Sequence, residues 1–340
     1  MIKSFINKLH YTNHSLAKSL LPISLIYRFI VTTRKLFYKN NIFKSTRLSI
    51  PIIVVGNITT GGTGKTPLVI YLAKILTENG FKPGIISRGY KAKTKHFPHA
   101  ISHHSTAKEV GDEPLLIYNR TQCPVVIDPN RVRGAKQLIS NFDCNIIISD
   151  DGLQHYALAR DIEIAVVDAA RLFGNGYCLP AGPLRESVSR LNEVTFVVYN
   201  GEESSFLPPH PNPLPQKGER VGVRGYMTLQ PTQPINLLDP NKIWNTTTKI
   251  HAVAGIGHPQ RFFETLKSLN FEVIEHPFPD HHDFKPSDIS FNDNLPVMMT
   301  EKDAVKCFSF AKENHWYLPV SAKLSDTLVE NLMIKIKNIK

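Results

Sequence analysis

The sequence predicts an α/β protein of the P-loop NTPase type, in which helices cover both faces of a mostly parallel sheet. The first observation is a β-branched apolar run at residues 52–55, which leads into a glycine-rich turn ending in Gly64-Lys65-Thr66. The second is the alternation of short apolar strands with helical patterns as far as Tyr199. The third is another strand–helix series from Lys249 onward, which predicts a smaller C-terminal α/β domain.

The composition is that of a globular protein in a reducing compartment. The chain has 340 residues, 42% hydrophobic and 20% charged, which is enough for one large or two ordinary domains. Its four cysteines form no Cys-x-x-Cys pair, so we expect neither a disulfide framework nor a zinc site. The formal net charge of +11 is unevenly placed, because residues 1–50 contain nine Lys and Arg and the first acidic residue is Glu78.

Residues 1–45 combine these cations with apolar and aromatic side chains. The longest apolar run, residues 20–27, contains Pro22 and ends at Arg28, so it is far shorter than the roughly 20 residues of a membrane-spanning helix. No small-residue cleavage site follows it, unlike in a signal peptide. A basic amphipathic segment suits an anionic membrane surface. An ordinary helix packed on the domain and a nucleic-acid-binding arm remain open alternatives.

The glycine-rich turn is the clearest functional signal. Glycines let successive backbone N–H groups point into one concavity, and the helical pattern at 68–76 adds positive potential from its N-terminus. We expect Lys65 to reach the β/γ-phosphates of a nucleotide and the Thr66 hydroxyl to ligate Mg²⁺. The expected phosphate-binding residues are Thr59, Thr60, Gly61, Gly62, Thr63, Gly64, Lys65 and Thr66. One departure is Thr59, which stands where the usual pattern has Gly; a Gly-rich turn with a capping Thr is the alternative.

The rest of the core follows in order. Strands are expected at 82–87, 124–128, 144–152, 162–168 and 194–199, with a helix at 130–140 and an apolar helical stretch after Pro114. The strand at 144–152 ends in Asp150-Asp151, the Walker B arrangement, where a carboxylate can hold Mg²⁺ directly or through water. The alternative is that one of the two acids caps the next helix.

The segment 204–226 is Pro-rich and has no periodicity, which favours a surface insertion or linker over a polyproline II recognition segment. Beyond it, strands at 250–256, 271–275, 296–300 and 316–320 and helices at 258–269 and from Ser325 suggest the smaller domain. We therefore expect a basic amphipathic segment at 1–45, a P-loop core at 46–203, the insertion at 204–226 and the C-terminal domain at 227–340.

Several further motifs are weak in isolation but specific together. In chain order they are Gly-Asn-Ile-Thr-Thr-Gly-Gly-Thr-Gly-Lys-Thr, Ser-Arg-Gly-Tyr, Gly-Asp-Glu-Pro, Asp-Asp-Gly-Leu-Gln-His, Leu-Pro-Ala-Gly-Pro-Leu-Arg-Glu, Asp-His-His and Thr-Glu-Lys-Asp-Ala-Val-Lys. From about residue 15 to 335, this order of motifs resembles that of the tetraacyldisaccharide 4'-kinase family, the lipid A 4'-kinases of Gram-negative bacteria. This family's loop is itself an atypical Walker A, which accommodates Thr59.

The resemblance implies transfer of the ATP γ-phosphate to the 4'-hydroxyl of a tetraacyldisaccharide 1-phosphate, forming lipid IVA. It implies ATP and Mg²⁺ as cofactors, and a lipid A precursor and an anionic membrane surface as partners, without nucleic acid. The enzyme would be a peripheral, monotopic monomer on the cytoplasmic face of the bacterial inner membrane.

The resemblance also carries roles onto matching residues of this chain. Lys65 and Thr66 would hold phosphates and Mg²⁺, and the metal environment would include Asp150, Asp151 and Glu186. Asp112, paired with His281, would accept the hydroxyl proton, because a histidine can orient a carboxylate and tune its pKa. His282 is the alternative partner. Candidates for contacting the sugar 1-phosphate or hydroxyls are Arg131, Gln154 and His155.

Three rival functions fit the residues less well. A P-loop GTPase needs an Asn/Thr-Lys-x-Asp motif, and Thr300-Glu301-Lys302-Asp303 misplaces the lysine. A soluble small-molecule kinase or ligase leaves the basic apolar arm without a purpose. A membrane-associated ATPase module that transfers no phosphate does not require Asp112, Asp150 and His281.

Overall fold

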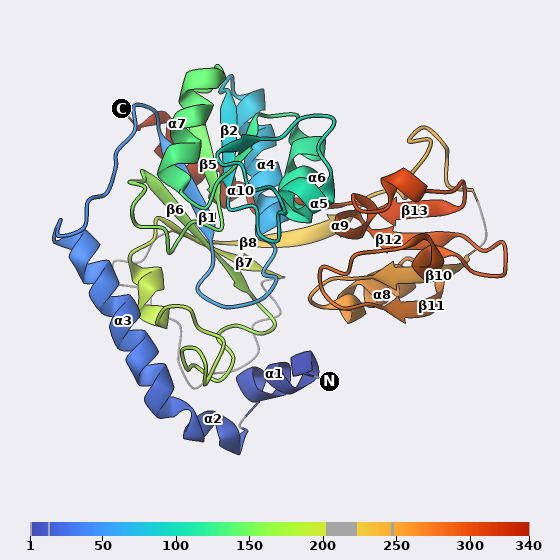
Figure 1. The fold of residues 1–340 in the computed structure, drawn as a ribbon, viewed down its shortest axis with the longest axis horizontal. Coiled ribbons are helices and arrows are strands. Elements are labelled where there is room, and N and C mark those ends of the chain that lie inside the picture. Colours follow the sequence, from blue (N-terminus) through green and yellow to red (C-terminus); the bar gives the residue numbers. More distant parts are fainter. Residues whose placement is uncertain (1, 13, 202–222, 246–247, 340) are drawn as a thin grey trace.

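The computed structural model describes residues 2–12, 14–201, 223–245 and 248–339. The described chain forms a nine-stranded sheet, which is the core, and a five-stranded sheet in a smaller domain beside it (Figure 1). The segment expected to be an insertion, 204–226, lies almost wholly outside the described residues. This architecture confirms the predicted fold class.

The centre of the core sheet is parallel and buried. In spatial order β7, β6, β1, β5, β2 and β4 lie side by side, and each pairs in parallel with its neighbours. Strands buried on both faces need apolar residues at consecutive positions, which is why β1 reads Ile-Ile-Val-Val. The six strands are β1 (Ile52–Gly56), β2 (Pro83–Ser87), β4 (Val125–Ile127), β5 (Ile146–Asp150), β6 (Ile162–Asp168) and β7 (Phe196–Asn200).

Helices cover the two faces of this sheet. On one face α4 (Lys65–Glu78), α6 (Asp112–Thr121) and α10 (Asp326–Lys337) share a hydrophobic core with the strands. On the other face α7 (Arg131–Asn141) packs with the loops that follow β5 and β6. A one-turn helix, α5 (Ala107–Val110), precedes α6, and a 3₁₀ helix spans Val188–Asn192.

The edges of the core sheet are made by strands that we did not expect. β8 (Val223–Pro231) pairs in parallel with β7, and β14 (Val320–Leu324) is antiparallel to β8. The short β3 (His99–Ala100) closes the opposite edge. Because β8, β14 and α10 belong to the core, the sheets divide the chain differently from the expected ranges: only the stretch between β8 and β14 forms the smaller domain.

The smaller domain has a mostly parallel sheet in the order β11-β10-β12-β13-β9. Its interior packs Phe263 and Leu266 of the covering helix against Met298 and Trp316 of the strands. The elements are β9 (Ile235–Asn236), β10 (Lys249–Ala254), α8 (Pro259–Ser268), β11 (Glu272–Pro277), β12 (Val297–Thr300), α9 (Glu301–Ala304) and β13 (His315–Leu318), with 3₁₀ turns at Pro286–Ile289 and Phe308–Phe310.

The N-terminal segment is helical: α1 (Ile2–Tyr11), α2 (Ser15–Ser19) and α3 (Leu21–Lys39). The long α3 continues past Arg28 to Lys39. It accommodates Pro22 because this residue stands in the first turn, where its missing N–H is tolerated. The Ser24 hydroxyl donates to the Cys178 carbonyl at 2.7 Å, and this bond holds α3 on the core. None of the helices described combines the length and the hydropathy needed to cross a bilayer.

Candidate active site

The predicted P-loop lies at the carboxyl end of β1 and leads into α4. Gly64 is the N-cap of the helix with φ +91°, and a Cβ there would lie 2.5 Å from the Asn200 amide nitrogen, so only glycine fits. Lys65 and Thr66 open α4, as the motif requires. The backbone of Thr59 forms a β-bridge with Leu184, and the Thr60 N–H donates to the Pro183 carbonyl at 2.8 Å. The start of the loop is thus tied to the segment 179–186.

Two carbonyls of the loop are held by residues at the ends of neighbouring strands. The Asn200 amide donates to the Thr63 carbonyl at 3.1 Å, and the Arg171 guanidinium donates to the Gly62 carbonyl at 2.6 Å. Arg171 also contacts His258 of the smaller domain and pairs with Asp168 at the end of β6. Residues that follow β6 or end β7 therefore fix the conformation of the P-loop.

The paired acids stand beside the P-loop. Asp151 has a left-handed backbone, φ +46°, a conformation that non-glycine residues adopt at a cost and that recurs at functional sites. Its carboxylate lies 3.5 Å from the Lys65 Nζ and 3.1 Å from the Arg185 Nη1. The Ser87 hydroxyl at the end of β2 donates to Asp150 at 3.1 Å.

The two acids have opposite pKa shifts. Burial, with Glu113 and Asp151 nearby, raises the pKa of Asp150 to about 6. Burial acts in the same direction on Asp151, but the cations Lys65 and Arg185 outweigh it and lower the pKa of that carboxyl to about 2. Carboxylates crowded in this way favour a cation between them.

The donor set fits Mg²⁺, which takes oxygen ligands and usually only one or two carboxylates from the protein. Asp150, Asp151 and the Thr66 hydroxyl supply such oxygens next to the phosphate-binding loop. Within the described ranges no group of three or more His, Cys, Asp or Glu side chains is arranged to hold a metal ion. A site here would therefore be completed by phosphate oxygens and water.

Asp112 and His281 come together across the boundary between the core and the smaller domain. The His281 Nδ1 lies 2.8 and 3.0 Å from the two carboxylate oxygens of Asp112, the first residue of α6. His281 has a left-handed backbone, φ +59°, and its backbone N–H donates to the Gly255 carbonyl at 3.0 Å. The alternative partner, His282, bonds instead to Asp288 at 2.9 Å.

The Asp112 carboxylate is ionised at neutral pH. Burial acts to raise its pKa, but the hydrogen bond from His281 and the charges of Lys302 and Lys306 hold the pKa below its usual value. The side chain is only 6% exposed, so these groups, and not bulk water, are its surroundings.

Glu186, expected near the metal, faces other residues. The Gln154 amide donates to one oxygen of Glu186 at 2.8 Å, and the Tyr156 hydroxyl donates to the other. Gln154 also donates to the Asn57 carbonyl at 3.1 Å. This partly buried set joins the segments after β1 and β5 to the segment 179–186, and so supports the walls of the site.

The other two substrate candidates differ in their surroundings. Arg131 is buried behind the end of β5, where its guanidinium donates to the carbonyls of Asp128 and Asp150 at 2.9 and 3.0 Å. Burial lowers the pKa of Arg131 to about 10. Burial and nearby arginines lower the pKa of His155 to about 4, so that its imidazole is neutral at pH 7.

Five residues at the site were not singled out from the sequence. Ser87 and Arg185 lie in motifs whose signal was weak alone, and Glu113 follows Asp112. Arg171 stands outside every motif, and only its geometry reveals it. Lys302 lies in the Thr-Glu-Lys-Asp-Ala-Val-Lys motif, which suggested no role for it.

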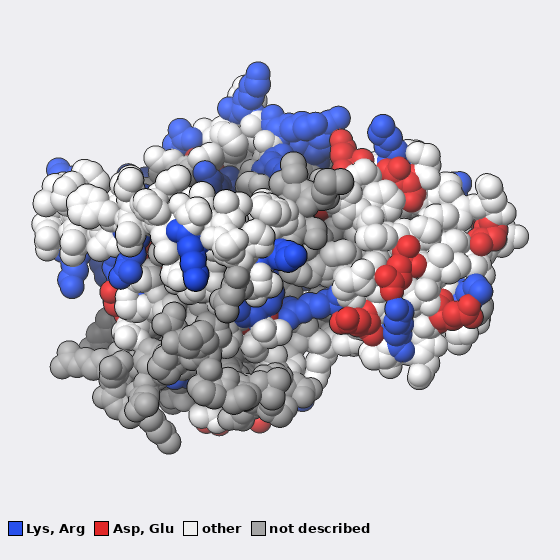
Figure 2. Space-filling model, turned by 90° about the horizontal axis from the view of Figure 1, so that it is seen from below, with Lys and Arg blue, Asp and Glu red and all other residues white. Residues whose placement is uncertain are grey.

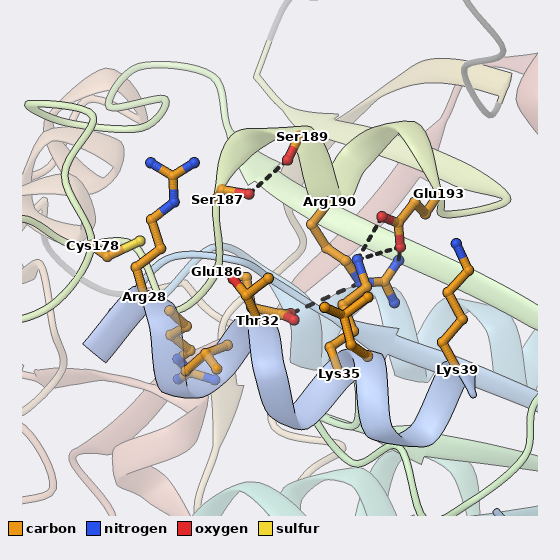
Figure 3. A pocket seen from close by; sticks show the side chains of 13 residues that line it. Arg28, Thr32, Lys35, Lys39, Cys178, Glu186, Ser187, Ser189, Arg190 and Glu193 are labelled. Carbon is orange, nitrogen blue, oxygen red and sulfur yellow. Dashed lines mark hydrogen bonds and ion pairs between the residues drawn. The ribbon is translucent and has the colours of Figure 1, made fainter. Parts of the chain in front are cut away.

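A hollow lies between α3 and the segment 185–193 (Figure 3). Cations from both sides line it, and Lys35 and Arg190 pair there with Glu193. Its charged lining residues are Arg28, Lys35, Lys39, Arg185, Glu186, Arg190 and Glu193. The hollow therefore carries an excess of positive charge.

Comparisons with known proteins agree on one family. The family model described as Tetraacyldisaccharide-1-P 4'-kinase (LpxK) matches residues 16–337. The chain is 47% identical to the tetraacyldisaccharide 4'-kinase of Legionella pneumophila (strain Corby), over 96% of this chain and 95% of that protein. It is 46% identical to that of Nitrosococcus oceani, over 94% and 91%. Its fold is similar to that of LpxK from Aquifex aeolicus crystallised in complex with ATP, with a TM-score of 0.78 and 29% identity over 94% of this chain and 99% of that one.

Proposed function

Because the chain belongs to the tetraacyldisaccharide-1-P 4'-kinase family, it is an ATP-dependent kinase of lipid A biosynthesis, and we propose that Asp112 is its catalytic base. The reaction transfers the γ-phosphate of ATP to the 4'-hydroxyl of a tetraacyldisaccharide 1-phosphate. The observation that carries the proposal is the contact between Asp112 and His281, made where the two domains meet. A module that only bound ATP would not need this pair.

Phosphoryl transfer demands positioning and charge neutralisation more than covalent chemistry from the protein. Lys65, at the N-terminus of α4, is placed to hold the β/γ-phosphates. Asp150, Asp151 and Thr66 would hold Mg²⁺, which supplies neutralisation of charge on the phosphate oxygens when it is bound. Arg185 pairs with Asp151 and so keeps that carboxylate in place beside Lys65.

Asp112 then accepts the proton of the attacking hydroxyl. Its carboxylate is ionised before the substrate arrives, and the Nδ1–H of His281 fixes its orientation. As the 4'-oxygen bonds to the γ-phosphorus and the β–γ bridging bond breaks, the hydroxyl proton moves to Asp112 and ADP departs.

Acceptor dependence separates this function from a membrane-associated ATPase module. In mixed micelles with ATP and Mg²⁺, ADP release should rise severalfold or more when the acylated disaccharide phosphate is added. An equal rate of ADP release with and without the acceptor would instead support the ATPase.

We place the enzyme on the cytoplasmic face of the inner membrane, as a monotopic monomer held by α3. This helix presents Ile23, Leu25, Ile26, Phe29 and Ile30 to solvent, each at least 54% exposed. Figure 2 shows largely uncharged surface toward the left, edged by Lys and Arg, whereas acidic side chains gather on the right. An apolar stripe flanked by cations suits an anionic lipid surface. The basic hollow beside α3 would then receive an anionic group of the lipid acceptor.

The stripe on α3 gives a direct prediction. The triple variant Leu25→Gln, Ile26→Gln, Phe29→Gln should bind anionic vesicles at least about 10-fold more weakly, since each buried apolar side chain contributes roughly 1.5–3 kcal/mol. Vesicle sedimentation measures this. The matched control is Ile243→Gln, because Ile243 is 79% exposed on the smaller domain. Equal sedimentation of the triple variant and the wild type would reject the anchor.

A further inference from the structure

Lys302, on α9, lies at the centre of the groups around the Asp112–His281 pair. Its Nζ is 2.7 Å from the Glu113 carboxylate and 3.3 Å from the His281 Nε2. It lies 4.0 Å from Asp112 and 3.9 Å from Asp280. Its side chain is 19% exposed. A largely buried ammonium with this many partners is held in one place.

The contact with His281 decides the protonation of the imidazole. An ammonium group has only donors, so the His281 Nε2 must accept the hydrogen bond and carry no proton. The ring proton is then on Nδ1, which faces the Asp112 carboxylate and donates to it. An imidazolium has no acceptor and would face Lys302 with like charge.

We propose that Lys302 is a positioning residue for phosphotransfer, which holds His281 as the neutral Nδ1–H tautomer and fastens it to the core through Glu113. The inference rests on the role proposed above for Asp112. Lys302 does not touch the reacting atoms; it acts through His281, whose Nδ1–H orients the Asp112 carboxylate toward the incoming hydroxyl.

The charge of Lys302 agrees with this role. Burial acts to lower its pKa, but Glu113, Asp112 and Asp280 outweigh it and raise the pKa above the usual value. The residue is therefore an ammonium throughout the neutral range, and it is one of the groups that hold the pKa of Asp112 low.

Other groups also lie near the pair, and the Asp280 carboxylate is 3.9 Å from the His281 Nε2. Lys306 bonds to Asp303 at 2.6 Å and lies over the Phe284 ring, and it is 4.0 Å from Asp112. The Tyr90 ring packs edge-on against the His281 ring, with centroids 5.3 Å apart. Of the lysines described, Lys302 is the one that hydrogen-bonds to the imidazole.

The domains stay joined at this point without Lys302. Arg120 of α6 bonds to both oxygens of Glu301 on α9 at 2.8 and 2.7 Å, and to the Ser321 hydroxyl at 3.1 Å. A Lys302→Met variant keeps these bonds and much of the side-chain volume. We therefore expect the effects of this variant to arise at the Asp112–His281 pair and not from separation of the two domains.

The experiment compares Lys302→Met and Lys302→Arg with Lys267→Met, a control on an exposed lysine of α8. Lys302→Met should lower kcat about 10- to 100-fold, part of what a positioned base contributes, with the KM for ATP within about 2-fold. The acid limb of the pH–rate profile of this variant should move to higher pH, because Asp112 loses a neighbouring cation that lowers the pKa of its carboxyl. Lys302→Arg should recover part of kcat, since a guanidinium can also donate to Nε2.

Nitrogen NMR of the imidazole gives a second measurement that does not depend on activity. The wild type should show His281 with Nε2 unprotonated, and Lys302→Met should show a mixture of tautomers at the same pH. Unchanged kcat, pH profile and tautomer in Lys302→Met would overturn the inference and leave the role of Asp112 intact. Failure of Asp112→Asn to lower kcat would instead remove the role on which the inference rests.

Discussion

The Asp112→Asn variant should retain its fold and lose about 10³-fold in kcat, with the KM for ATP within about 2-fold of the wild type. The amide cannot accept the hydroxyl proton, and a positioned general base contributes roughly 10²- to 10⁴-fold. A 10³-fold loss is about 4 kcal/mol of transition-state stabilisation. The ATP site should be unaffected, because Asp112 contacts His281 and the lysines of the smaller domain and not the P-loop lysine.

Initial rates at saturating ATP and acceptor measure this loss. The matched control is Asp143→Asn, since the Asp143 side chain is 86% exposed and pairs only with Lys82 among the contacts described. A large rise in the KM for ATP with unchanged kcat would contradict the assignment of Asp112 as the base.

Lys65→Met should lower kcat/KM for ATP by about 10²- to 10³-fold, and part of the loss should fall on kcat. In the transition state, the Lys65 ammonium is expected to stabilise the negative charge on the β- and γ-phosphate oxygens. Electrostatic interactions of this kind carry most of the catalysis of phosphoryl transfer. Removal of the ammonium also leaves Asp151 with one cation fewer, so the pKa of that carboxyl should rise toward its ordinary value.

Lys74→Met is the control for Lys65→Met, because Lys74 lies on the same helix with its side chain 75% exposed. Steady-state kinetics with ATP as the varied substrate compare the two variants. Values of kcat and KM within about 2-fold of the wild type in both variants would remove Lys65 from the phosphate site.

The parts predicted best from the sequence are those fixed by local pattern. β1, the glycine turn and the start of α4 form one continuous segment, and its predicted strand–turn–helix order is confirmed. The run of isoleucines before Asp150-Asp151 likewise identified β5. Apolar continuity marks a strand buried on both faces, and glycine marks the turn, so neither requires knowledge of distant residues.

The parts that were missed depend on pairing between distant segments. β14 joins the core only because β8 offers it an edge, and the two strands lie nearly a hundred positions apart in the chain. No local periodicity reveals that return, and so the sequence-based ranges placed α10 with the smaller domain. The packing of Leu328 and Leu332 of α10 against the core sheet holds this returning segment in place.

The site shows the same division. Motif order was enough to pair Asp112 with a histidine, but only the structure distinguishes His281 from His282, because adjacent residues point to different partners. The backbone of Thr59 and Thr60 binds the segment 179–186, a contact that no spacing rule contains. Lys302 and Arg171 gain their positions from the docking of the two domains.

The most direct test of the kinase mechanism uses γ-labelled ATP, Mg²⁺ and tetraacyldisaccharide 1-phosphate in mixed micelles, with Asp112→Asn beside the wild type. The wild type should transfer the label to the acceptor only when Mg²⁺ is present, and fragmentation of the product should place the new phosphate at the 4'-position of the distal sugar. The variant should form product about 10³-fold more slowly. Absence of labelled lipid with the wild type, or a phosphate at any other position, would contradict the mechanism.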